Sequence, residues 1–97
     1  MDEKEIAENA EWAAKTIQYE LFNAGRKMDN GGALIIKEYL RRLLTDLFSG
    51  KDMTPERINE TFKAVYSEYE TSTPDEVINA ANVIRDKFDK LIEGLTH

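Results

Sequence analysis

The sequence predicts an all-α fold, a compact up-and-down four-helix bundle, and three observations support this prediction. Apolar residues recur every three or four positions in four separate segments, which is the spacing of one helix face. Glycines or Thr-Pro pairs bound these segments, as is typical of helix ends and helix starts. The connections are short, which favours antiparallel neighbours within a single helical domain over residues 1–97.

The first helix is expected over about residues 2–24. Its inner face is rich in alanine, and small side chains there would let a neighbouring helix approach closely. Gly25 follows as the expected helix stop. The inward-facing stripe consists of Ile6, Ala10, Ala13, Ile17, Leu21 and Ala24.

The second helix is expected over about residues 33–48, after a turn formed by residues 29–32. A phosphate-binding loop has four residues between its glycines and then Lys and Ser or Thr. Here five residues separate Gly25 from Gly31, and Gly32 and alanine follow. We therefore interpret the stretch as a helix stop followed by a Gly31–Gly32 hinge. The second helix is apolar over a wide arc, which predicts a central position in the bundle.

The third and fourth helices are expected over about residues 55–70 and 74–95. Thr54 is a suitable N-cap with proline after it, and Thr73 with Glu76 has the spacing of a capping box. The stripe of the third helix is Ile58, Phe62, Val65, Tyr66 and Tyr69. The stripe of the fourth helix is Val77, Ala81, Ile84, Phe88, Leu91 and Leu95.

Composition excludes several kinds of site. The sequence has no cysteine, so disulfides and thiolate metal sites are impossible. Its one histidine is the last residue, His97, which argues against catalytic triads and imidazole metal sites. The acidic start is unlike a secretory signal, and no apolar run approaches the length of a membrane span. We expect a cytoplasmic protein without membrane association, cofactor, metal or catalytic residues.

One enzyme class stays open as an alternative. Glu8 and Glu11 have the spacing Glu-x-x-Glu. In this spacing and in size the chain resembles all-α, magnesium-dependent nucleotide pyrophosphohydrolases, which carry Glu-x-x-Glu followed by Glu-x-x-Asp. No Glu-x-x-Asp follows here. Asp86 and Asp89 are the nearest approximation, and they come too late in the chain. A divergent enzyme of this type is the alternative to a non-enzymatic role.

Nucleic-acid binding is disfavoured by the charge pattern. The net charge is −6, and the only basic cluster is Lys37, Arg41 and Arg42 on the second helix. Glu38 is placed to pair with Arg42 at the i,i+4 spacing. The acidity allows another alternative, a protein that blocks the nucleic-acid-binding channel of a target enzyme.

A second stripe on the first helix is the predicted protein interface. At 100° per residue, Trp12, Tyr19 and Phe22 project away from the alanine-rich face, and Lys15 lies at their rim. Aromatic side chains at a desolvated centre dominate association energies. Internal packing of this stripe is the competing interpretation.

These features predict a small, acidic, non-enzymatic helical protein that binds a protein partner as a regulator, inhibitor or immunity-type modulator. The partner expected first is a second copy of the chain, bound through the first helix as a homodimer, because small helical proteins most often pair with their own copies. A distinct target protein is expected next.

Overall fold

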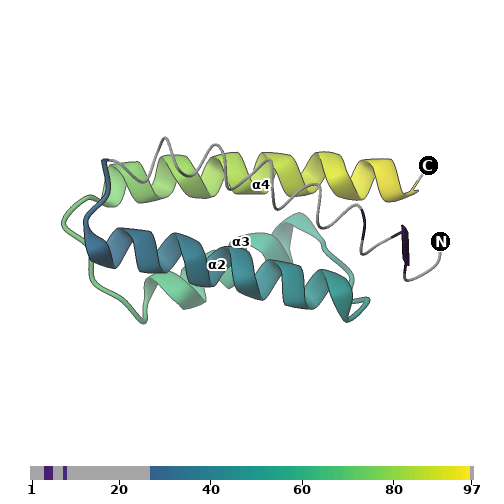
Figure 1. Cartoon of the computed structure of the whole chain (residues 1–97), viewed down its shortest axis with the longest axis horizontal. Coiled ribbons are helices and arrows are strands. Elements are labelled where there is room, and N and C mark those ends of the chain that lie inside the picture. Colours follow the sequence, from purple (N-terminus) through teal and green to yellow (C-terminus); the bar gives the residue numbers. More distant parts are fainter. Residues whose placement is uncertain (1–3, 6–7, 9–26, 97) are drawn as a thin grey trace.

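The structure is a computed structural model that describes residues 4, 5, 8 and 27–96. The described part is all-helical, without strands, and contains α2 (Asn30–Phe48), α3 (Pro55–Tyr66) and α4 (Pro74–Thr96) (Figure 1). The all-α prediction is confirmed. The first expected helix falls outside the described residues except at three helical positions, so the four-helix bundle and its dimer stay predictions. None of the described helices combines the length and the apolar character needed to span a bilayer.

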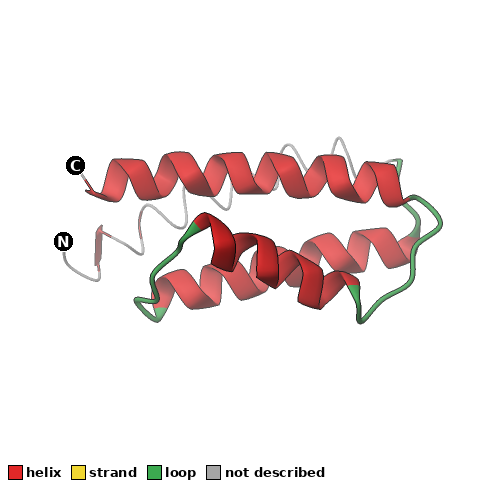
Figure 2. Ribbon diagram, turned by 180° about the vertical axis from the view of Figure 1, so that it is seen from behind, coloured by secondary structure: helices red, strands yellow, loops and turns green. Residues whose placement is uncertain are grey.

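The helices α2 and α4 run in the same direction, and α3 returns antiparallel beside both of them (Figures 1 and 2). A core of buried apolar side chains joins all three. The Tyr39 ring lies within this core, and its hydroxyl donates a 3.2 Å hydrogen bond to the carbonyl oxygen of Ile58. Burial raises the pKa of this hydroxyl. The core residues without exposed surface are Ile35, Leu43, Ile58, Val65, Val77, Ile84 and Phe88.

Three helix boundaries lie where the sequence predicts them. The Thr54 hydroxyl caps α3 by accepting a 3.1 Å hydrogen bond from the backbone N–H of Arg57. Gly50 follows the end of α2 with a φ of 74°, a conformation that glycine adopts without steric cost. The helix α4 begins at Pro74, as expected, and extends one residue beyond the predicted end.

Two boundaries were predicted wrongly. The helix α2 begins at Asn30 rather than at residue 33, because Asp29 is its N-cap and accepts a hydrogen bond from the backbone N–H of Gly32. The two glycines therefore lie in the first turn of α2 rather than in a connecting hinge. The helix α3 ends at Tyr66 rather than at residue 70, and the following residues leave the helix to reach Asp29.

The Asp29 clamp, formed by Asp29 with Thr71, Ser72 and Thr73, joins the start of α2 to the start of α4. The Asp29 carboxylate accepts hydrogen bonds from the Thr71 hydroxyl at 2.7 Å and the Ser72 hydroxyl at 2.8 Å. It also accepts one from the Ser72 backbone N–H at 2.5 Å. In return the Asp29 backbone N–H donates to the Thr73 hydroxyl at 3.1 Å. The clamp thus uses both the side chain and the backbone of Asp29.

The clamp replaces the capping box that the sequence predicts for α4. The Thr73 hydroxyl accepts from the Asp29 backbone, and no hydrogen bond joins it to Glu76 in the part of the chain that the structure describes. Sequence spacing identifies local caps, whereas Asp29 is 44 residues away from Thr73. The Thr73 hydroxyl therefore bonds to Asp29, which is distant in the sequence, instead of forming the local capping box.

The clamp requires glycine at position 31. A Cβ atom there would lie 1.8 Å from the carbonyl oxygen of Glu70, which is backbone and cannot rotate away. At Gly32 a Cβ would lie 2.8 Å from a methyl group of Val77. The two glycines therefore let the first turn of α2 touch the loop before α4 and the first turn of α4.

We expect Gly31→Ala to lower the free energy of unfolding by about 1–3 kcal/mol, because the added methyl group overpacks a backbone contact. Gly94→Ala is the matched control, since a Cβ at Gly94 meets nothing within 4 Å. In the helix this control substitution should raise stability by up to about 0.5–1 kcal/mol. Urea unfolding followed by circular dichroism measures both. Equal effects of the two substitutions would contradict the close approach.

The clamp also predicts a dependence of stability on pH. Hydrogen bonds from the Ser72 and Gly32 backbone, and then from the hydroxyls, hold the pKa of Asp29 well below its usual range. The folded pKa is lowered, so the stabilisation is complete above about pH 4 and is lost as the pH falls further. Asp29→Asn should flatten the fall in the urea midpoint below about pH 4.

The matched comparison for the clamp is Thr54→Ala, which removes a cap with one local hydrogen bond and should cost about 1 kcal/mol. Asp29→Ala should lower the urea midpoint more than Thr54→Ala at neutral pH, because it breaks contacts between two helix starts. A smaller loss at Asp29 would show that the clamp does not stabilise the fold.

Candidate functional site

The predicted interface residues Trp12, Lys15, Tyr19 and Phe22 lie outside the described residues, so this interface stays a prediction. Glu8 is helical and exposed, whereas Glu11 also lies outside the described part. The described surfaces that could bind a partner therefore belong to α2, α3 and α4.

An apolar groove lies between α3 and α4. We call it the α3–α4 groove; it is a hollow of about 320 Å³ lined by Phe62, Lys63, Tyr66, Ser67 and Ile78. Phe62 and Tyr66 are one helical turn apart on α3, so they lie on one face. Ile78 comes from the second turn of α4 and forms the opposite wall.

The aromatic wall of the groove is anchored in the core. The buried Tyr39 ring, 1% exposed, packs edge-on against Phe62 with ring centroids 5.2 Å apart. Phe62 in turn lies 5.6 Å from the Tyr66 ring. These distances are typical of favourable aromatic pairs. The row runs from the interior to the surface, so the groove wall is held in place before any partner arrives.

The opposite wall is exposed to solvent. Ile78 is 45% exposed, although its neighbour Val77 is fully buried. One exposed aliphatic residue has no meaning by itself. Here the exposed isoleucine faces a hollow whose other wall is aromatic, and such apolar concave surfaces are where partners bind.

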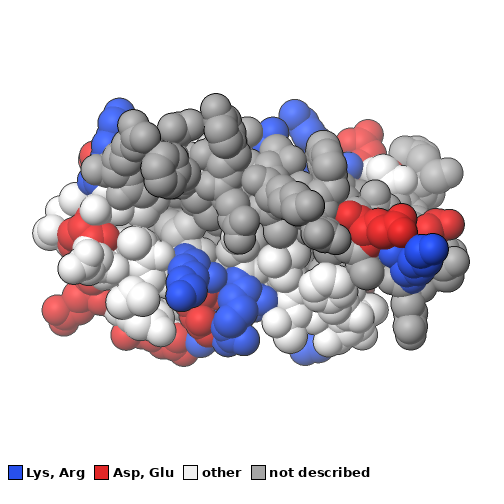
Figure 3. Space-filling view, in the orientation of Figure 1, with Lys and Arg blue, Asp and Glu red and all other residues white. Residues whose placement is uncertain are grey.

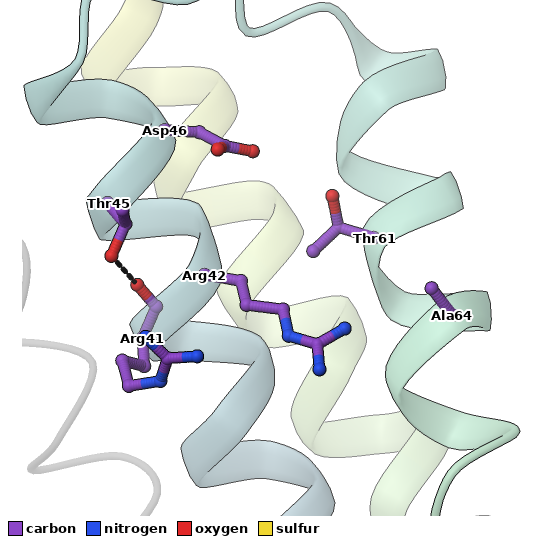
Figure 4. Close-up of a pocket in the computed structure, with 6 residues that line it drawn as sticks. All are labelled: Arg41, Arg42, Thr45, Asp46, Thr61 and Ala64. Carbon is purple, nitrogen blue, oxygen red and sulfur yellow. Dashed lines mark hydrogen bonds between the residues drawn. The ribbon is translucent and has the colours of Figure 1, made fainter.

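A second hollow, of about 240 Å³, lies between α2 and α3 and is lined by Arg41, Arg42, Thr45, Asp46, Thr61 and Ala64. Figure 4 shows the Arg42 guanidinium reaching from α2 toward α3. The Thr45 and Thr61 hydroxyls donate to carbonyl oxygens of their own helices at 2.8 Å, so neither is directed at a ligand.

Ion pairs already satisfy the arginines of this second hollow. Glu38 pairs with Arg41 and accepts from Arg42 at 3.2 Å, which confirms the predicted i,i+4 pair. Arg42 also donates to Glu68 at 2.7 Å and so links α2 to the residues that follow α3. Hydrogen bonding from Arg41 and then from Arg42 lowers the pKa of Glu38 to about 2. An anion would have to displace two carboxylates beside Asp46.

Lysine and arginine side chains gather over the middle of α2 (Figure 3). They belong to the predicted cluster of Lys37, Arg41 and Arg42, and the pairing of both arginines with acids reduces its positive charge. Among the described residues, no three or more acidic or histidine side chains come together as metal ligands would.

Comparisons of the sequence with protein-family models and curated proteins, and of the fold with solved structures, find no match. The surface of the described residues is therefore the only guide to a function.

The sequence predicts the positions of some groove residues but not their exposure. Phe62 and Tyr66 fall on the stripe of the third helix, which predicts core positions, yet both are only partly buried. Ile78 was missed, because it lies beside the stripe that begins at Val77. The available signal was an isoleucine off the 4-3 spacing of a helix whose other off-stripe positions are mostly polar.

We expect Ile78→Ser to change the free energy of unfolding by less than about 1 kcal/mol, because this side chain is largely a surface one. Ile84→Ala, at a fully buried position of the same helix, should cost about 2–5 kcal/mol. Urea unfolding of both variants tests whether Ile78 belongs to the core. A loss at Ile78 close to that at Ile84 would mean that the groove wall is structural.

Proposed function

We propose that this protein is a non-enzymatic binding protein that takes a segment of a partner protein into the α3–α4 groove and thereby regulates or inhibits that partner. The observation that supports the proposal is the half-exposed Ile78 opposite the partly buried Phe62 and Tyr66. Such an apolar surface gains free energy when a partner removes it from water.

The size of the groove favours a protein segment over a small molecule. Its volume of about 320 Å³ is at the lower end of small-molecule pockets, which bury most of their ligand. The groove instead lies along the surface between two helices, where one or two anchoring side chains could enter. The predicted aromatic stripe of the first helix remains a second proposed contact surface.

A second candidate function is supported by the exposed acids. Residues 55–96 carry nine acidic and five basic side chains, so an acidic protein that occupies a nucleic-acid channel of a target enzyme is also compatible with this half. The two candidates differ in their salt dependence. Channel blocking should weaken steeply with salt, whereas an interface centred on the groove should persist.

The proposal is tested by affinity capture from the source cell's lysate with wild type, Ile78→Ser and Leu34→Ser. Leu34 is the matched control. Its side chain is 49% exposed, a fraction similar to that of Ile78, and it lies on α2 outside the groove. A captured partner should be lost with Ile78→Ser and kept with Leu34→Ser, and purified partner should reproduce this difference. Trp12→Ala, in the same experiment, tests the aromatic stripe.

A partner kept by Ile78→Ser and lost by Trp12→Ala would contradict the role of the groove and favour the first helix. If both groove and control variants captured the same proteins as wild type, the groove would not be the binding surface.

A further inference from the structure

We infer that the segment taken up by the α3–α4 groove is an amphipathic helix whose apolar stripe is flanked by lysine and arginine. The inference rests on the proposed function and names the chemistry of the partner. It follows from the shape of the groove, from the charges along its edges, and from the net charge of the chain itself.

The shape of the groove favours a helix. Its two walls are the neighbouring helices α3 and α4, which are seen together on the near side of the molecule in Figure 2. A third helix laid between two helices fills such a groove with side chains three and four residues apart. No strand occurs among the described residues, so they offer no sheet edge to which an extended peptide could add.

The length of α3 limits the length of the segment. Its 12 residues extend over roughly 18 Å, which corresponds to about three turns of a partner helix. A large apolar side chain of that helix would enter the hollow between Tyr66 and Ile78. The long stem of Lys63 would lie against the same helix while its ammonium group stays in water.

The row of α4 residues that contains Ile78 carries two acids and one base. Ile78 belongs to a row of α4 residues three or four positions apart, which are Asp75, Ile78, Asn82, Arg85 and Asp89. The one base in this row, Arg85, lies 3.7 Å from the carboxylate of Asp86. Asp75 and Asp89 are exposed, and neither has a salt bridge within the described part of the chain. Cationic side chains of a partner helix would therefore find carboxylates along α4.

The α3 edge carries a similar charge. Glu56 and Glu60 are exposed on the solvent side of α3, where Lys63 is the only exposed base. Lysines on a partner helix would meet more carboxylates than ammonium groups on this side as well. Charges of this kind contribute more to the choice of partner and to the association rate than to affinity.

The same charges argue against a second copy as the occupant. A dimer through this groove would place two acidic edges against each other, in a chain whose net charge is −6. Nucleic acid would be repelled for the same reason. A cationic amphipathic helix of another protein satisfies both the apolar groove and its edges.

The test uses a synthetic amphipathic peptide of about 14 residues, which spans roughly 21 Å as a helix. One peptide carries leucines on a single face and lysines beside them, and a matched peptide replaces the lysines with glutamates. Binding to the full chain is followed by calorimetry and by amide chemical shifts. Wild type is compared with Ile78→Ser, Leu34→Ser, Asp89→Asn and Asp52→Asn, the last being an exposed acid on the loop before α3.

We expect saturable binding of the lysine peptide, with shifts concentrated at Phe62, Tyr66 and Ile78. Ile78→Ser should weaken it about fivefold or more, and Leu34→Ser should leave it unchanged. Asp89→Asn should weaken it about twofold to fourfold and Asp52→Asn should not. The glutamate peptide should bind at least about tenfold more weakly, and this difference should shrink as salt is added.

Equal binding of the two peptides in the groove would overturn the inferred charge of the partner and leave the proposed function standing. Lysine-peptide binding that Ile78→Ser does not weaken would be general charge attraction and would overturn the inference. If neither peptide shifts the groove amides, the helical occupant is wrong, and the capture experiment decides separately whether the groove binds a partner. Groove shifts that grow with protein concentration alone would identify a second copy instead.

Discussion

The contact between Asp29 and the loop before α4 is the constraint on which the rest of the described structure depends. Through one carboxylate and one backbone N–H, Asp29 caps α2 and holds Thr71, Ser72 and Thr73 in place. The chain can make this contact only if α3 stops early, because the residues after Tyr66 have to cross to the start of α2. The end of α3 and the start of α4 are thereby fixed relative to each other.

The groove is a consequence of that geometry. Since α3 ends at Tyr66, no further turn of this helix covers Ile78 on the facing side of α4. The Phe62 and Tyr66 rings are held by the buried Tyr39, so the wall does not collapse onto the isoleucine. The same feature that closes one end of the molecule leaves an apolar hollow beside it, bordered by more acids than bases.

Much of this fold could be predicted from the sequence, because local chemistry determines it. The spacing of apolar residues located three helices, and Thr54 with Pro55 marked the start of α3 correctly. The errors share one cause, a contact between residues far apart in the chain. Two adjacent glycines are typical of a hinge. Only the position of Glu70 shows that Gly31 is needed because the backbone of the loop before α4 approaches it closely. The spacing places Ile78 outside the apolar stripe of α4, and only the end of α3 shows that this residue faces a groove. The interface role of Trp12 remains a prediction, because it lies outside the described residues.

The parallel course of α2 and α4 has an electrostatic consequence. Aligned peptide dipoles give every helix a partial positive charge at its N-terminus, and here two such ends lie side by side. Two like poles repel each other, and the carboxylate of Asp29 lies at the point where they meet. Its negative charge therefore does more than accept hydrogen bonds, because it offsets the repulsion between two helices that would otherwise be favoured in opposite directions.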